Sequence, residues 1–432
     1  MSPAWVGLLS AAALLVLILG RVPVATALGL IGLVGYSALE GWTKAAAVVG
    51  SVPLELASAY TLSVVPLFTL MGAFATTAGL SSDLFRAANA CFAGRQGSLA
   101  MAAIGASAGF GAVCGSSVAT AATMSKVSIP EMVRAGYAPG FATAAVAAGG
   151  TIGILIPPSL ILMIYAIIAQ QSVIKLFAAA LIPGLVLTVL YLVTIAVQVR
   201  MKPSIAPRVA RPDGSSIGRD LIRIWDVALL FVLTFGGIYL GWFSPTEAAA
   251  VGASGAAVIG WARRRLPYRH LVGCFGDTVR ITANLTLIIL GSTIFSYFIV
   301  QSGIATALVA GIGALGVAPW VVMLLLVMFY VALGCFLEGI GMVLITVPVL
   351  LPLVVANGYD PVWFGVLLVI LIEIGLVTPP LGMNIFVIRA QAPGIGLPEM
   401  FRGVLPFLIA PLVLIVVLFV FPELALWLPR HV

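Results

Sequence analysis

Apolar runs separated by short polar breaks extend along the whole chain of 432 residues. Three of these runs, at residues 8–20, 176–199 and 405–422, approach or exceed the roughly 20 residues that a helix needs to span a bilayer. The sequence lacks the regular alternation of apolar and polar residues that is typical of a transmembrane barrel. The pattern therefore predicts an all-α integral membrane protein.

Composition agrees with this class. Hydrophobic residues make up 62% of the chain and charged residues only 8%, whereas a soluble domain carries about 25% charged residues. The net charge of +7 indicates an excess of Lys and Arg in cytoplasmic loops, so binding of nucleic acid is not expected. The four cysteines show no metal-type spacing, and we predict no cofactor.

One arrangement of prolines and glycines occurs in both halves of the chain. Its members are Pro130, Gly136, Gly153 and Pro157-Pro158 in the first half, and Pro352, Gly358, Gly375 and Pro379-Pro380 in the second. Each pair is separated by 222 residues (375 − 153). Gly and Pro interrupt helices, and matching interruptions in two apolar halves point to the substrate and ion site of a transporter.

A polar stretch divides the chain into halves of about equal length. Residues 200–223 hold six basic residues and two acids among Pro, Gly and Ser, which is typical of a linker. Because Lys and Arg in short loops favour the cytoplasm, we predict a first repeat at residues 1–199, a cytoplasmic linker at 200–224 and a second repeat at 225–432.

The basic residues outside the linker predict how the two halves are oriented. Arg86, Arg95 and residues 263–265 all fall on the cytoplasmic side if the first helix begins outside. The halves then enter the membrane from opposite faces, which is an inverted-topology repeat with both termini in the periplasm. We expect each half to contain about five spans, a re-entrant hairpin and a Pro-Pro broken helix.

Two segments are too polar and too rich in small residues to be ordinary spans. In residues 97–128 we predict a hairpin with Gly115-Ser116-Ser117 at its tip, and in residues 334–346 Glu338-Gly339 stands at the equivalent place. Small residues also permit ordinary close packing of helices. For residues 97–112 taken alone, that second interpretation stays open.

A broken helix is predicted after each hairpin, at residues 148–159 and 372–384. Consecutive prolines remove two amide donors and clash with the preceding carbonyls. Unpaired backbone at membrane depth is tolerated only where it is buried in protein or lines a cavity. The freed carbonyls, with the hydroxyls of Thr151, Ser159 and Thr378, are hard oxygens that suit a small cation, and the helix N-termini beyond the breaks suit an anion. One break would indicate a kink, whereas two in register favour a functional site.

Two acids lie in apolar sequence, Glu338 at the second hairpin tip and Glu373 before the second break. An ionisable residue inside a membrane is by default a functional hypothesis. Either carboxylate also fits a helix cap or the neutralisation of a buried Arg. Since Glu373 has no basic neighbour in sequence, an ion site or polar network is favoured there, and the role of Glu338 stays open.

Four strings carry a resemblance to a known family: CGSSVATAATM, GYAPGFATAAVAAGGTIGILIPPS, LITVPVLLPLV and IEIGLVTPPLGMN. Over nearly its whole length the chain resembles the large membrane subunit of tripartite ATP-independent periplasmic (TRAP) transporters, the DctM-like family. The resemblance implies an elevator-type permease of the bacterial inner membrane that takes up an organic anion, such as a C4-dicarboxylate or sialic acid, with sodium as coupling ion. It also implies a periplasmic substrate-binding protein and a small four-helix membrane subunit, which we expect to be a separate polypeptide.

The resemblance also assigns site residues, at the positions that match the family pattern. The expected sodium sites comprise Ser116, Ser117, Thr120, Gly150 and Thr151 in the first half, and Gly334, Glu338, Gly339, Thr378 and Pro379 in the second. The expected substrate contacts are Pro158, Ser159, Pro380 and Asn384.

Other classes of protein fit less well. A one-component sodium/dicarboxylate symporter would use similar hairpins without a binding protein, and a channel would show no sodium coupling. The paired breaks argue against an ATP-driven permease. An intramembrane serine protease is disfavoured because neither His270 nor His431 lies in an apolar span where it could act as a base, so we do not expect an enzyme.

Overall fold

The computed structural model of the protein describes residues 3–20, 22–209, 218, 222, 224–379 and 382–432, and the regular structure in these ranges is helical. The helices of the first half are α1 Pro3–Leu19, α2 Val24–Glu40, α3 Trp42–Ser58, α4 Val64–Thr77, α5 Leu80–Phe92, α6 Ser98–Cys114, α7 Ser117–Arg134, α8 Pro139–Leu155, α9 Leu160–Ile168 and α10 Val173–Met201. Those of the second half are α12 Trp225–Phe231, α13 Gly237–Tyr239, α14 Pro245–Ala262, α15 Tyr268–Ser302, α16 Ile304–Ala314, α17 Pro319–Gly334, α18 Gly339–Ala356, α19 Pro361–Val377, α20 Met383–Gln391, α21 Leu397–Val404, α22 Ile409–Val420 and α23 Glu423–Leu426.

The two halves repeat the same order of helices at the offset found in the sequence. Shifted by 222 residues (339 − 117), α7 and α8 coincide at both ends with α18 and α19. One clear difference separates the halves: α3 and α4 are interrupted by the 3-10 turn Tyr60–Ser63, whereas their counterpart α15 is continuous over 35 residues. Pro66, in the first turn of α4, explains the interruption, because proline fits the start of a helix but breaks its interior.

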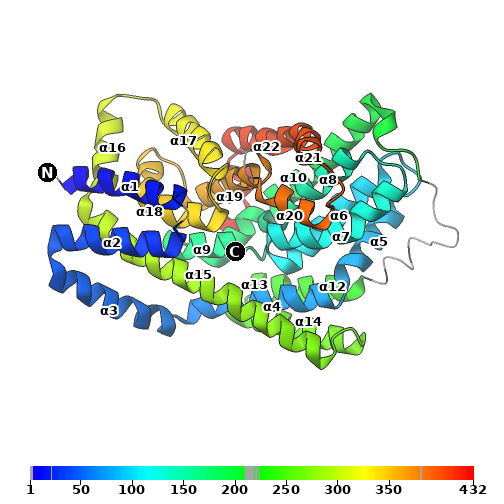
Figure 1. The fold of residues 1–432 in the computed structure, drawn as a ribbon, viewed down its shortest axis with the longest axis horizontal. Coiled ribbons are helices and arrows are strands. Elements are labelled where there is room, and N and C mark those ends of the chain that lie inside the picture. The colour runs from blue at the N-terminus through cyan, green and yellow to red at the C-terminus, as the bar shows by residue number, and fades with distance from the viewer. Residues whose placement is uncertain (1–2, 21, 210–217, 219–221, 223, 380–381) are drawn as a thin grey trace.

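Contacts between the halves are exchanged as an approximate two-fold relation requires. Helix α2 packs against α15 while α14 packs against α4, and α7 packs against α20 while α18 packs against α9. The two helices that precede the breaks, α8 and α19, touch each other. Figure 1 shows the hairpin α6–α7 and the hairpin α17–α18 on opposite sides of α9 and α19. The breaks therefore lie between the two hairpins, where the first break is buried and the second is exposed at Pro379.

Small residues permit the close packing of the central helices. Position 150 illustrates this: a Cβ added to Gly150 would lie 2.9 Å from the Ala121 side chain of α7. In the second half, a Cβ on Gly375 would lie 2.6 Å from the backbone of Gly334. Helix α8 is buried along nearly all of its length. The Gly- and Ala-rich sequence is thus used for backbone approach within a helical core.

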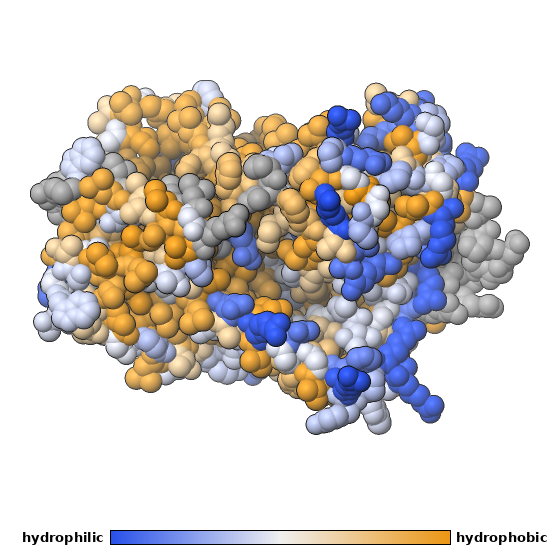
Figure 2. Space-filling view, viewed as in Figure 1, coloured by the Kyte–Doolittle hydropathy of each residue, from blue (hydrophilic) through white to orange (hydrophobic). Residues whose placement is uncertain are grey.

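The outer surface is that of a membrane protein. Six helical segments of the described chain are long and apolar enough to cross a bilayer, at Tyr60–Thr77, Pro139–Ile168, Val173–Met201, Tyr268–Ser302, Gly339–Ala356 and Leu397–Val420. On the face drawn in Figure 2, apolar residues cover most of the molecule and hydrophilic residues gather towards one end. The prediction of an all-α integral membrane protein is confirmed.

A cluster of ion pairs lies where α5, α12 and α14 meet. Arg263 pairs with Asp83 and with Asp226, and both carboxylates are buried. Arg86 also pairs with Asp83, at 2.6 Å. Three of the basic residues that the charge pattern assigned to one face of the membrane, Arg86, Arg263 and Arg265, are therefore brought together around Asp83.

We predict that Arg263→Ala destabilises the protein strongly, because the buried Asp226 loses its basic partner and Asp83 loses one of several. Breaking a buried pair in this way costs roughly 3–5 kcal/mol. The measurement is the melting temperature of the purified protein in detergent. Arg264→Ala is the matched control, since the Arg264 side chain is exposed. An equal effect of the two substitutions would show that the Arg263 ion pairs are not needed for stability.

Candidate functional site

The first hairpin turns at the residues predicted from the sequence. Helix α6 ends at Cys114, Gly115 adopts the left-handed conformation with φ +65°, and α7 begins at Ser117. The Ser116 side chain caps α7 by accepting a hydrogen bond from the Ala119 N–H. Because glycine tolerates this conformation, the chain reverses within two residues and holds the start of α7 inside the protein.

The first break lies directly against this tip. Helix α8 ends at Leu155, and α9 begins at Leu160 after the cis pair Pro157-Pro158. The Leu160 N–H donates to the Gly115 carbonyl at 3.4 Å, so the start of α9 contacts the hairpin. Ser159 caps α9 and is fully buried. Pro158 and Ser159, two of the predicted substrate contacts, are thus next to the first hairpin tip.

The predicted sodium ligands of the first half fall into two places. A Cβ on Gly150 would lie 3.3 Å from the Ser117 carbonyl, so Gly150 and the start of α7 are in contact. Thr120 also faces α8, and its buried hydroxyl has no hydrogen-bond partner within the described ranges. Thr151 is different: its hydroxyl contacts the Ala148 carbonyl at 2.6 Å and the Tyr191 hydroxyl of α10 at 3.0 Å. The fold therefore brings Ser116, Ser117, Thr120 and Gly150 together and turns the Thr151 hydroxyl towards α10.

The second hairpin and break are arranged in the same way with fewer polar atoms. Gly334 lies against Gly375, and Gly339 lies against Ile372 and Ile161. Glu338 occupies the position before α18 without capping it, and its side chain is exposed. The Thr378 hydroxyl donates to the Ile374 carbonyl at 2.5 Å. Pro379 is exposed, and Pro380 lies outside the described residues.

A polar junction joins the two halves between the first hairpin and the second break. Asn384 on α20 donates through Nδ2 to the Ser117 hydroxyl at 2.7 Å, and this hydroxyl contacts Glu373 Oε2 on α19 at 3.4 Å. All three side chains are at most 1% exposed. Glu373 Oε1 and Asn384 Oδ1 remain without a hydrogen-bond partner in the part of the chain that is described. Two oxygen acceptors, one on a carboxylate and one on an amide, are therefore buried at this junction without donors among the described residues.

The sequence predicts a role for each of these three residues but does not predict that they contact one another. It predicts Glu373 as a functional acid, Ser117 as a sodium ligand and Asn384 as a substrate contact. Ser117 and Glu373 are 256 residues apart in the chain, and Ser117 and Asn384 are 267 apart. The repeat offset could not reveal the contact, because it pairs each residue with its counterpart in the other half and not with its neighbour in space.

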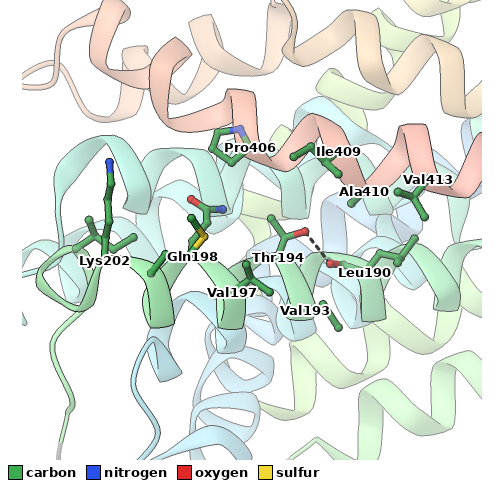
Figure 3. A pocket seen from close by; sticks show the side chains of 12 residues that line it. Leu190, Val193, Thr194, Val197, Gln198, Lys202, Pro406, Ile409, Ala410 and Val413 are labelled. Carbon is green, nitrogen blue, oxygen red and sulfur yellow. Dashed lines mark hydrogen bonds between the residues drawn. The ribbon is translucent and has the colours of Figure 1, made fainter.

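A groove of about 530 Å³ lies elsewhere, between α10 and the segment that leads into α22. Figure 3 shows its mainly apolar lining, with Lys202 at one end and the Thr194 hydroxyl bonded to the Leu190 carbonyl at 2.8 Å. None of the predicted site residues lines it. Its apolar walls and outward position make it a poor candidate for an ion or a small organic anion.

One serine needs separate mention because residues 105–109 have the G-x-S-x-G spacing of serine hydrolases. In hydrolases this serine sits exposed on a sharp turn between a strand and a helix. Here Ser107 lies inside α6, fully buried against Gly149. The spacing therefore reflects helix packing and not a nucleophile.

Comparison with known proteins decides which of the transporter classes applies. Residues 11–424 match the family described as tripartite ATP-independent periplasmic transporter, DctM component. The chain belongs to this TRAP transporter family. The C4-dicarboxylate TRAP transporter large permease protein DctM of Pseudomonas aeruginosa is 36% identical over 378 residues, which cover 87% of this chain and 88% of that protein. The sialic acid TRAP transporter large permease protein SiaM of Vibrio cholerae is 32% identical and covers 86% of each chain.

A solved structure supports the fold. The Alcanivorax borkumensis YdaH transporter superposes with a TM-score of 0.63 and covers 89% of each chain, at 16% sequence identity. Such a likeness concerns architecture alone. This TRAP permease is thus a multi-pass membrane protein with the helical arrangement of a known transporter structure, and its relatives are transport components.

The glycine contacts of the site generate a test of packing. We predict that Gly375→Ala impairs assembly, because the new Cβ would lie 2.6 Å from the Gly334 backbone, which has no side chain that could move away. Overpacking of this kind costs roughly 1–3 kcal/mol. Size-exclusion chromatography of the detergent extract and the melting temperature report the effect.

The control is Gly105→Ala in α6, where the nearest atom to the new Cβ would be 3.6 Å away, an ordinary contact. This TRAP permease should tolerate that change. Normal assembly and stability of the Gly375→Ala variant would mean that α17 and α19 can separate without cost.

Proposed function

We propose that this TRAP permease uses a sodium gradient to take up an organic anion across the inner membrane. The main support for this proposal is the polar junction of Ser117, Glu373 and Asn384, where a hairpin tip meets a broken helix inside an apolar protein. Hard oxygen ligands at such a break suit a small cation. The relatives named for a C4-dicarboxylate and for sialic acid indicate a carboxylate substrate.

The proposal includes two partners. A periplasmic binding protein delivers the anion, and a separate small four-helix membrane subunit completes the permease, as the tripartite family description supports. Movement follows an elevator scheme, in which the hairpins and broken helices move as one body against the remaining helices. The breaks lie between the two hairpins, where one such body would carry both of them.

The orientation in the membrane is part of the same proposal. Both termini face the periplasm and the linker at residues 200–224 faces the cytoplasm. The clustering of Arg86 with Arg263 and Arg265 around Asp83 supports one cytoplasmic end. Labelling of a cysteine placed at Ser215 by an impermeant reagent outside intact cells would contradict this orientation.

Reconstitution tests the function. In liposomes that contain this chain and the small subunit, a sodium gradient should drive uptake of the anion from the loaded binding protein. The chain alone should give little or no uptake, since delivery and part of the membrane assembly are missing. Robust sodium-driven uptake by the single chain would favour a one-component sodium/dicarboxylate symporter.

The sodium ligands are tested at the second break. The Thr378 hydroxyl donates its proton to Ile374 and keeps its lone pairs for a cation. Thr378→Val preserves shape and removes this oxygen. Loss of one charge-assisted interaction costs roughly 1.5–3 kcal/mol, so the sodium concentration for half-maximal uptake should rise about tenfold or more. An unchanged sodium curve at normal expression would assign Thr378 to helix capping alone.

A further inference from the structure

The junction of Ser117, Glu373 and Asn384 has an arrangement of hydrogen bonds that leaves only acceptors unused. A serine hydroxyl carries a single proton, and Ser117 directs it to Glu373 Oε2. Ser117 must then accept from Asn384, which fixes the amide with Nδ2 towards the serine and Oδ1 away from it. Glu373 Oε1 and Asn384 Oδ1 are buried acceptors without a donor among the described residues.

The charge of Glu373 also lacks a partner. The residue is 1% exposed within a helix of Ile, Leu and Val, and it forms no ion pair with the residues that the structure describes. A carboxylate buried in apolar surroundings needs a compensating cation or a bound proton. Carboxylate, amide and hydroxyl oxygens are the ligands of hard cations. One carboxylate balances a monovalent cation, whereas a divalent cation would leave an excess charge in the core.

Comparison of the two repeats shows that the polar residues of this junction have no polar equivalent set at the symmetry-related position. At the offset of 222 residues (373 − 151), the counterparts of Ser117, Glu373 and Asn384 are Gly339, Thr151 and Leu162. These counterparts contain no carboxylate, and the Thr151 hydroxyl is already engaged with Tyr191. The charged junction is therefore an addition to the symmetric pair of hairpins and breaks.

We propose that Glu373, Asn384 and Ser117 hold one sodium ion at the junction of the two halves. This site is additional to the sodium sites predicted at the hairpin tips, and it shares Ser117 with the first of them. The site rests on the proposed sodium-coupled function and deepens it. Its ligands come from α7, α19 and α20, so an ion bound there ties the first hairpin to the second broken helix. Release of the ion leaves a buried carboxylate unpaired, which favours separation of these elements and entry of water.

Equilibrium binding of radioactive sodium tests the site without knowledge of the anion. The protein is this chain purified with its small subunit, and the probe is sodium alone with choline as the replacement cation. Glu373→Gln keeps the shape of the side chain and removes its charge. The variant should bind one sodium ion fewer per chain at saturation. Glu131→Gln on the exposed part of α7 is the matched control and should bind as many ions as the wild type.

A second variant and a second readout cover loss of folding. Asn384→Leu retains the carboxylate and removes one ligand, so it should weaken binding of that ion while the number of ions at saturation is unchanged. The sodium-dependent rise in melting temperature should be smaller in Glu373→Gln than in the wild type, because a ligand of the folded state stabilises it. An unchanged number of bound ions and an unchanged rise in melting temperature in Glu373→Gln would overturn the site.

The outcomes separate this inference from the proposed function. Uptake by the wild-type assembly that is independent of sodium would contradict the proposed function. The binding count would still decide the site: a lost ion in Glu373→Gln supports it, and an equal count overturns it. Uptake whose pH dependence disappears in Glu373→Gln, at an equal count of bound sodium, would make Glu373 a proton carrier and overturn the sodium site.

Discussion

Unpaired backbone inside a membrane is the constraint on which the arrangement of this fold depends. The interruption at residues 156–159 leaves peptide groups without helical partners, and lipid offers them none. The fold responds by burying this interruption against the tip of the first hairpin and by packing α8 against α19. The need to cover this break explains why α8 is buried on all sides, and its Ala and Gly residues let neighbouring helices approach it closely.

The central helices are covered by backbones that approach closely at points where small residues allow it. Gly150 and Gly375 admit the neighbouring helices to distances at which any Cβ would collide. The same packing excludes water and side-chain bulk from the centre. Polar atoms that remain there, such as the Thr120 hydroxyl and the Glu373 carboxylate, are therefore held in a site of low dielectric constant, where an interaction with an ion is strong.

The sequence predicted the backbone of this arrangement better than its polar contacts. The offset between Gly153 and Gly375 anticipated the paired breaks, and Gly115-Ser116-Ser117 was correctly placed at a hairpin tip. These features depend on local conformational rules for Gly and Pro, which the sequence displays directly. The direction of the Thr151 hydroxyl and the contact of Ser117 with Glu373 depend on which helices become neighbours, and local rules carry no such information. Which of the predicted ligands can bind an ion depends on these contacts between helices.

A reversal of side-chain sizes between the two halves explains why the polar junction occurs only once although the backbone is repeated. In the first half, Gly150 on the central helix makes room for the Ser117 turn of the hairpin. In the second half the sizes are reversed, with Ile372 on the central helix against Gly339 on the hairpin. The helix separation is preserved in both, but only the first hairpin can carry a side chain with a hydroxyl into the centre. Glu373 follows Ile372 in the chain and accepts a hydrogen bond from the Ser117 hydroxyl of the other half. Its counterpart Thr151 contacts Tyr191 instead. The repeated backbone therefore carries a carboxylate on only one side of its centre.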